Sequence, residues 1–121
     1  MKYRIKSGKL EDSDGNLLGT GWSGQREGYN NPAMVSISKT GPLPPGTYAI
    51  GPAYTHPHLG PVVMNLNPDP GNEMYGRDDF RIHGAAELNP ELSSEGCIIL
   101  PRSVREALVA RADRTLEVVP E

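Results

Sequence analysis

The sequence lacks the features that identify several common protein classes. Only one of its 121 residues is a cysteine, so no disulfide can form within the chain. No segment approaches the roughly 20 consecutive apolar residues of a membrane-spanning helix. The formal net charge of −3 leaves no basic excess that would favour binding to nucleic acid or to an anionic membrane. We therefore expect neither a disulfide scaffold, nor membrane insertion, nor nucleic-acid binding.

Glycine and proline are abundant, with 14 and 12 residues, and they separate short apolar runs. Such spacing is typical of a turn-rich β domain, and the length suits one domain spanning residues 1–121. One helix is predicted over 101–112, because Pro101 suits a helix start and apolar residues recur at helical spacing after it. The pattern predicts strands at 2–6, 17–20, 33–39, 47–50, 62–66, 80–83 and 115–119, with 2–6 and 17–20 flanking a turn at 14–16.

The N-terminal stretch MKYRIKSGKLEDSDG contains no apolar segment of the kind found in secretory signal peptides. We therefore expect synthesis in the cytoplasm without a signal peptide. A target outside the cell would then require a non-classical delivery route.

Cys97 and His83 form the candidate catalytic pair. A free thiol has a pKa of about 8.5, and an imidazole within hydrogen-bond reach can accept its proton and later pass it to a leaving amine. The 14 residues from His83 to Cys97 include Gly84, Asn89, Pro90 and Gly96, so they can form a return loop between two strand ends. The amides of Gly96 and Cys97 are the candidate oxyanion hole, since glycine permits a sharp turn there.

Structural roles for the same residues remain open at this point. A lone cysteine before Ile-Ile-Leu is often a small buried apolar residue, and a histidine at a strand end can be satisfied by backbone. His56 and His58 could join a metal site, but Pro57 and the single cysteine favour a surface turn that the histidines cap, so no metal is expected. Trp22 either packs the core or offers a platform for a sugar or peptide.

The motifs FRIHG (80–84) and SSEGCIIL (93–100) resemble the signature of the YkuD-type L,D-transpeptidases. Further matches run through GTGWSG, YNNP, GPLPPGTYAIG and GPVVMNLNPDPGNEMYGRDDFRIHG, and they resemble a subgroup of type VI secretion and phage-associated effectors. The resemblance covers about residues 19–106. It implies a compact β-sandwich or distorted barrel, with one helix after the catalytic cysteine.

The resemblance also implies a reaction. Cys97 would attack the L,D bond of a peptidoglycan stem tetrapeptide, His83 would act as base and acid, and the Gly84 carbonyl would orient the ring. Release of D-alanine would leave a thioacyl enzyme, which water or an amine would resolve as a carboxypeptidase, transpeptidase or D-amino-acid exchange. No cofactor is implied. The implied partners are peptidoglycan stem peptides, a cognate immunity protein and a secretion-machine carrier, with action in the periplasm of a target bacterium.

The chain departs from the family pattern on both sides of the cysteine. Glu95 stands where many members have histidine, and Ile99 where many have arginine. Arg102 is the nearest positive residue that could bind a substrate carboxylate instead. Together with Ser94, Glu95 and Tyr75 it forms the predicted substrate-binding set. Glu95 and Ile99 also favour the alternative function, a non-catalytic peptidoglycan-binding or phage structural module with the same fold.

Overall fold

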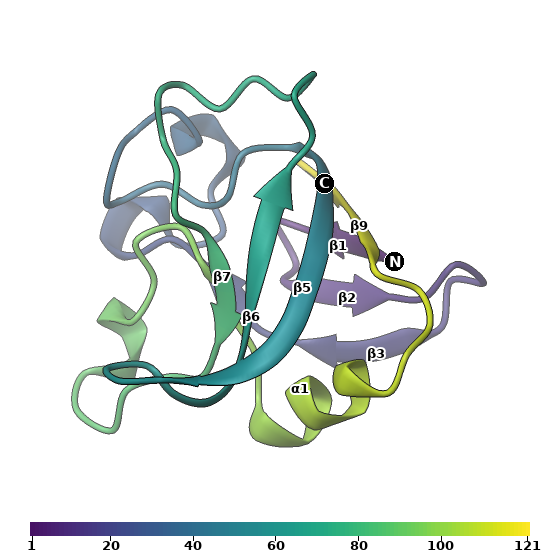
Figure 1. Cartoon of the computed structure of the whole chain (residues 1–121). Coiled ribbons are helices and arrows are strands. Elements are labelled where there is room, and N and C mark those ends of the chain that lie inside the picture. Colours follow the sequence, from purple (N-terminus) through teal and green to yellow (C-terminus); the bar gives the residue numbers. More distant parts are fainter.

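The computed structural model describes residues 1–121 as one sheet of nine strands with a single α-helix (Figure 1). The strand order is β3-β2-β1-β9-β5-β6-β7-β8-β4. This confirms the mainly-β class and the helix after the cysteine. The elements are β1 Lys2–Arg4, β2 Lys9–Glu11, β3 Leu17–Thr20, β4 Trp22–Ser23, β5 Gly46–His56, β6 Gly60–Pro68, β7 Arg81–His83, β8 Ile98–Ile99, α1 Arg102–Val109 and β9 Thr115–Val119.

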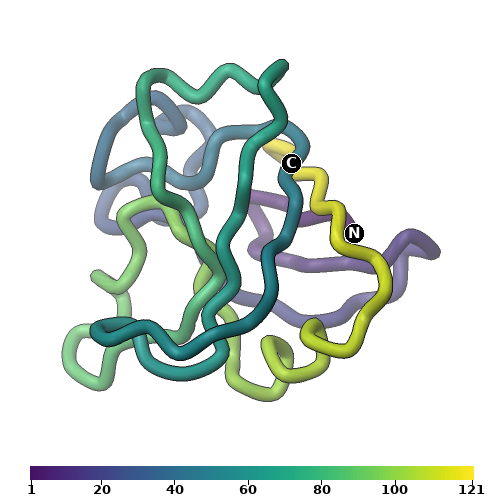
Figure 2. The backbone as a smooth tube through the Cα atoms, in the orientation of Figure 1, coloured from purple at the N-terminus to yellow at the C-terminus, as the bar shows by residue number.

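The connection between β3 and β4 explains why the sheet is curled. These strands lie at opposite ends of the strand order, yet only Gly21 separates them in the chain. The two ends of the sheet must therefore lie close together, so the sheet curls; Figure 2 traces the backbone in the same orientation. Gly21 fits this joint because it has no side chain; a Cβ there would collide with the carbonyl oxygen of Ile99.

The apolar faces of the curled sheet enclose one core. Ile82 of β7 and Ile98 of β8 are neighbours in it, each about 1% exposed. Burial of each such side chain stabilises the fold by roughly 1.5–3 kcal/mol, so the two strands that carry the candidate pair are firmly anchored. The whole cluster comprises Tyr3, Ile5, Leu10, Leu43, Tyr48, Ile50, Met64, Leu66, Phe80, Ile82, Ile98, Leu100, Leu108, Leu116 and Val118.

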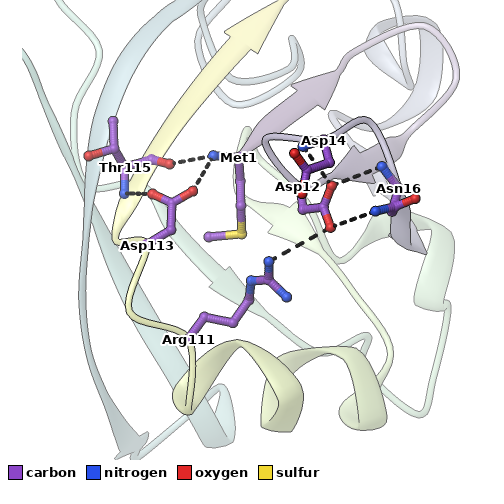
Figure 3. Close-up of polar contacts among 7 residues, drawn as sticks. All are labelled: Met1, Asp12, Asp14, Asn16, Arg111, Asp113 and Thr115. Carbon is purple, nitrogen blue, oxygen red and sulfur yellow. Dashed lines mark hydrogen bonds and ion pairs between the residues drawn. The ribbon is translucent and has the colours of Figure 1, made fainter.

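The expected hairpin near the N-terminus has different partners from those predicted. β3 pairs with β2, and β1 pairs with β2 on one side and in parallel with β9 on the other. The turn at 12–16 therefore joins β2 to β3. Asp12 organises this turn by accepting hydrogen bonds from Asp14 and Asn16, and it also lies 3.9 Å from the Arg111 guanidinium (Figure 3).

Residues 33–39 form no strand, contrary to the sequence prediction. Asn31 and Pro32 start a 3₁₀ turn there, and the Asn31 side chain accepts a hydrogen bond from the Ala33 amide. Further turns follow, with the amide of Ile37 donating to Met34 and that of Gly41 to Ile37. The segment thus satisfies its backbone locally.

Candidate active site

The strands β7 and β8 bring Cys97 and His83 to the same side of the sheet. They run parallel, with Ile82 opposite Ile98 and His83 opposite Ile99. Continued by one residue, this register sets Arg81 beside Cys97, and the Arg81 amide donates a hydrogen bond to the thiol Sγ at 3.3 Å. Side chains alternate along a strand, so residues 81 and 83 share the face on which the thiol lies. Cys97 and His83 are therefore diagonal neighbours on adjacent strands.

Both side chains line one groove with a volume of about 500 Å³. Its walls come from segments that are far apart in the sequence: residues 38–39, Leu59 at the tip of the β5–β6 hairpin, residues 76–81, residues 92–93 and Glu95. A cavity of this size lies within the range of small-molecule and peptide sites in proteins. The groove gives the thiol access to a ligand although its strand is buried.

His83 is held in a defined orientation. Its Nδ1 lies 2.8 Å from the carbonyl oxygen of Gly84, which can only accept a hydrogen bond, so Nδ1 carries the proton and Nε2 is the basic nitrogen. The ring is 3% exposed. Burial lowers the pKa of His83 below its ordinary value, the hydrogen bond to Gly84 offsets part of this by raising the pKa, and the nearby charge of Arg105 lowers it again. The imidazole is thus a neutral base at neutral pH.

Cys97 is a neutral thiol at rest for the same reason. Burial raises the pKa of the thiol, the amide and guanidinium of Arg81 lower it, and the carboxylates of Asp79 and Glu95 raise it. Burial is the largest of these effects. A resting thiolate–imidazolium ion pair is therefore not favoured. The arrangement suits a base that removes the proton as the sulfur attacks, rather than a pre-ionised nucleophile.

This gives a prediction for the pH dependence of thiol labelling. Iodoacetamide should modify Cys97 more slowly than free cysteine between pH 7 and 8, because a raised pKa leaves less thiolate at a given pH. Glu95→Gln should speed the reaction about two- to fivefold, since a partly screened negative charge is removed. Mass spectrometry of the labelled protein measures both rates. Labelling of the wild type faster than free cysteine near pH 7 would contradict the neutral pair.

A model of the Tlde1 domain matches residues 19–119, most of the chain, including both members of the pair. The chain belongs to the Tlde1 domain family. Tlde1 domains are effector domains of type VI secretion, which implies export towards a target cell. A search among curated proteins gave no match to the sequence. No helix of this Tlde1 domain has the length and apolar character needed to cross a membrane.

The turn before the nucleophile of this Tlde1 domain is built around buried hydroxyl groups. Ser94 is fully buried, and its Oγ accepts from the amides of Gly24 and Gly96 and donates to the Cys97 carbonyl. Ser23 donates to the carbonyl of Gly96 at 2.9 Å. These contacts correct the expectation that Ser94 binds substrate: its hydroxyl is used inside the turn.

The expected oxyanion donors are also revised. The Gly96 amide already donates to Ser94 Oγ at 3.2 Å, so it is committed to the turn. The Cys97 amide donates to no protein acceptor and is the one member of the expected pair that remains available. Gly96 has φ +130°, and a Cβ on it would lie 2.5 Å from Phe80 and 2.6 Å from Arg77. Glycine is required here for the backbone conformation and for space.

Two other predicted substrate-binding residues lie away from the groove. Arg102 is exposed, pairs with Glu106 at 2.8 Å, and lines a separate hollow beside Trp22. Tyr75 is 46% exposed on the loop after β6 and does not line the groove. Glu95 does line it. The predicted replacement of the missing family arginine by Arg102 is therefore not supported by its position.

Of the two histidines outside the groove, His56 caps a turn with its ring, as the structural alternative predicted, and His58 contributes its backbone amide to that turn. His56 Nδ1 accepts hydrogen bonds from the amides of His58 and Leu59 at 3.0 and 3.1 Å. Trp22 stacks on Tyr29 with ring centroids 6.0 Å apart. Leu59, which this turn positions, is the hairpin residue that reaches the groove.

Arg77 is the site residue that sequence reasoning missed. Its guanidinium is buried and donates to four carbonyl oxygens at 2.6–3.0 Å, three on segment 35–42 and one on Glu95. It also lies over the ring of Phe80, 5.2 Å from its centroid. Arg77 thereby ties one wall of the groove to the turn that carries the nucleophile.

Proposed function

We propose that this Tlde1 domain is a cysteine-dependent enzyme that modifies peptidoglycan stem tetrapeptides, with Cys97 as nucleophile and His83 as base and acid. The observation that carries the proposal is the placement of both side chains on one face of adjacent strands, at one groove, with Nε2 of the imidazole left as the basic nitrogen. The YkuD-type motifs around both residues point to the same chemistry.

The proposed reaction uses the neutral pair directly. His83 Nε2 takes the Sγ proton as sulfur attacks the carbonyl of the L,D bond, and the resulting imidazolium gives that proton to the amine of the departing D-alanine. A thioester to Cys97 remains. Water hydrolyses it with His83 again as base, which completes a carboxypeptidase cycle, or an amine takes the acyl group in a transpeptidation or D-amino-acid exchange. The Cys97 amide supports the oxyanion.

Incubation with purified muropeptides tests the proposal. Wild type should remove the terminal D-alanine from tetrapeptides, and Cys97→Ala should reduce the rate by at least about 1,000-fold, because the covalent route is lost. Mass spectrometry of the muropeptides reads the loss directly. His83→Gln, which keeps a side chain of similar length without a base, should reduce the rate of D-alanine removal by a similar factor.

A non-catalytic wall-binding module is the second candidate. The raised thiol pKa and the committed Gly96 amide favour it, since both weaken a resting nucleophile. Unchanged muropeptides with wild type, together with retained binding to purified wall, would decide for this module against the enzyme.

We further propose that the whole chain acts as one catalytic domain against the cell wall of a target bacterium, in the periplasm. The Tlde1 match supports delivery by type VI secretion. A producing cell would then need an immunity protein, and a carrier on the secretion machine would be a second partner.

A further inference from the structure

We infer that Arg81 binds the free C-terminal carboxylate of the peptide, so that the enzyme selects chains ending one residue after the bond it cleaves. This rests on the proposed function and adds a specificity-determining residue to it. The residue expected in this role from the sequence is Arg102, which lies on a different hollow.

Arg81 stands at the right distance from the reacting sulfur. Its own amide touches Cys97 Sγ at 3.3 Å, and its side chain leaves β7 on the face shared with His83. In the substrate, only the amide nitrogen and one Cα separate the scissile carbonyl carbon from the terminal carboxylate carbon. Standard bond lengths keep these carbons within about 4 Å of each other. A carbonyl placed on Sγ therefore brings the carboxylate within reach of the side chain of Arg81.

The guanidinium of Arg81 is fixed but not saturated. Three of its five N–H groups are used: Nε donates to the Tyr54 hydroxyl at 3.1 Å, Nη1 to the Asp79 carbonyl at 3.3 Å, and Nη2 to the Asp79 carboxylate at 3.1 Å. One N–H on each terminal nitrogen remains. Because Asp79 accepts from both terminal nitrogens, the two remaining N–H groups point in different directions, and each can donate one charge-assisted hydrogen bond to a carboxylate oxygen.

The other positive groups of the groove are less suited to this role. Arg77 is buried and uses its donors on four backbone carbonyls. Lys39 is exposed on the wall formed by residues 38–39, and its ammonium is a strongly hydrated point charge on a flexible stem. Glu95 and Asp79 also line the groove, and their negative charges repel a carboxylate, so an arginine is needed to hold one there. Arg81 is thus the cation that combines contact with the nucleophile and free donors.

The experiment compares two substrates that differ only at the terminus. One is the stem tetrapeptide with its free C-terminal carboxylate, and the other is the same peptide as the C-terminal amide. Wild type should cleave the acid with a kcat/KM about 10- to 100-fold above that for the amide, the range of a charge-assisted hydrogen bond. Arg81→Gln should raise the thiol pKa and so slow both substrates to the same degree, and it should lower cleavage of the acid about 10- to 100-fold further, so that the acid-to-amide ratio falls to about one. The acid-to-amide ratio of Arg81→Lys should lie between the ratios of the wild type and Arg81→Gln.

The ratio of the two rates separates recognition from a general structural defect, which would lower both rates together. A third peptide, amidated only at the side carboxylate of the diamino acid, should behave like the acid. Arg102→Gln serves as the matched variant and should keep the wild-type ratio. Equal cleavage of acid and amide by wild type, or loss of the ratio in Arg102→Gln alone, overturns the role of Arg81 while leaving the enzyme in place. If wild type cleaves none of the peptides, the proposed function fails and this inference with it.

Discussion

Replacing Arg77 with leucine is expected to lower the free energy of unfolding by about 3–5 kcal/mol, the largest effect that we expect from a single substitution in this protein. The substitution keeps apolar volume beside Phe80 but removes the donors for the carbonyls of Val35, Gly41, Pro42 and Glu95. Buried acceptors without partners each cost about 1–3 kcal/mol unless the loop moves to reach water. A whole domain of this kind has a net stability of only about 5–15 kcal/mol.

Urea unfolding of the wild type and variant measures this loss. Arg77→Lys should recover only part of it, because one ammonium cannot meet four carbonyls that surround a planar group. Arg102→Ala is the control, since that side chain is exposed and should change stability by no more than about 0.5 kcal/mol. A loss below about 1 kcal/mol for Arg77→Leu would mean that segment 35–42 holds its position without the arginine.

The second large effect is expected at Gly96. Gly96→Ala should cost about 2–4 kcal/mol, because the added methyl group would meet Phe80 and Arg77 at 2.5 and 2.6 Å on a backbone with φ +130°. The same substitution should reduce turnover of muropeptides more than it reduces stability, since any relief of the clash moves the adjacent Cys97.

Gly15→Ala is the control that separates the backbone penalty of a positive φ from the steric clash in the destabilisation by Gly96→Ala. Gly15 has φ +84°, but a Cβ added to it would meet no atom within 4 Å, so it carries only the backbone penalty, about 1 kcal/mol. The difference between the two variants measures the steric part at Gly96. The double variant Gly96→Ala/Arg77→Leu should lose less than the sum of the single variants, because one of the two clashes disappears with the guanidinium. Equal losses at Gly15 and Gly96 would rule out the steric part.

The sequence predicted the parts of strands that carry buried apolar residues. It missed the parts that are exposed or that form only through pairing with a distant strand. The prediction of 62–66 lies within β6, and that of 47–50 lies within β5. Both strands continue beyond the predicted ends, and residues 52–55 of β5 are exposed, so no apolar period marks them. β4 has only two residues and forms by pairing with β8, a contact that the local sequence does not encode.

The candidate site divides in the same way. The spacing of His83 and Cys97 left a structural role open, and the resemblance of the flanking motifs to a known family was needed to predict a catalytic pair; the structure places both residues on one groove. Arg77 lies in the stretch GRDDF, which has the composition of a solvated loop. Its burial depends on carbonyls about 18 to 42 residues away in the chain. Ser94 was misassigned for a related reason: a serine beside a nucleophile suggests contact with substrate, while its actual partners are backbone groups of the turn.

The joint at Gly21 also affects the tendency of the protein to aggregate through its sheet edges. Exposed strand edges act as templates on which further chains can add, and long edges therefore promote aggregation. Here the sheet ends in strands of four and two residues, β3 and β4, and the residue that joins them lies against Ile99. A chain with such short edges offers little backbone for intermolecular pairing.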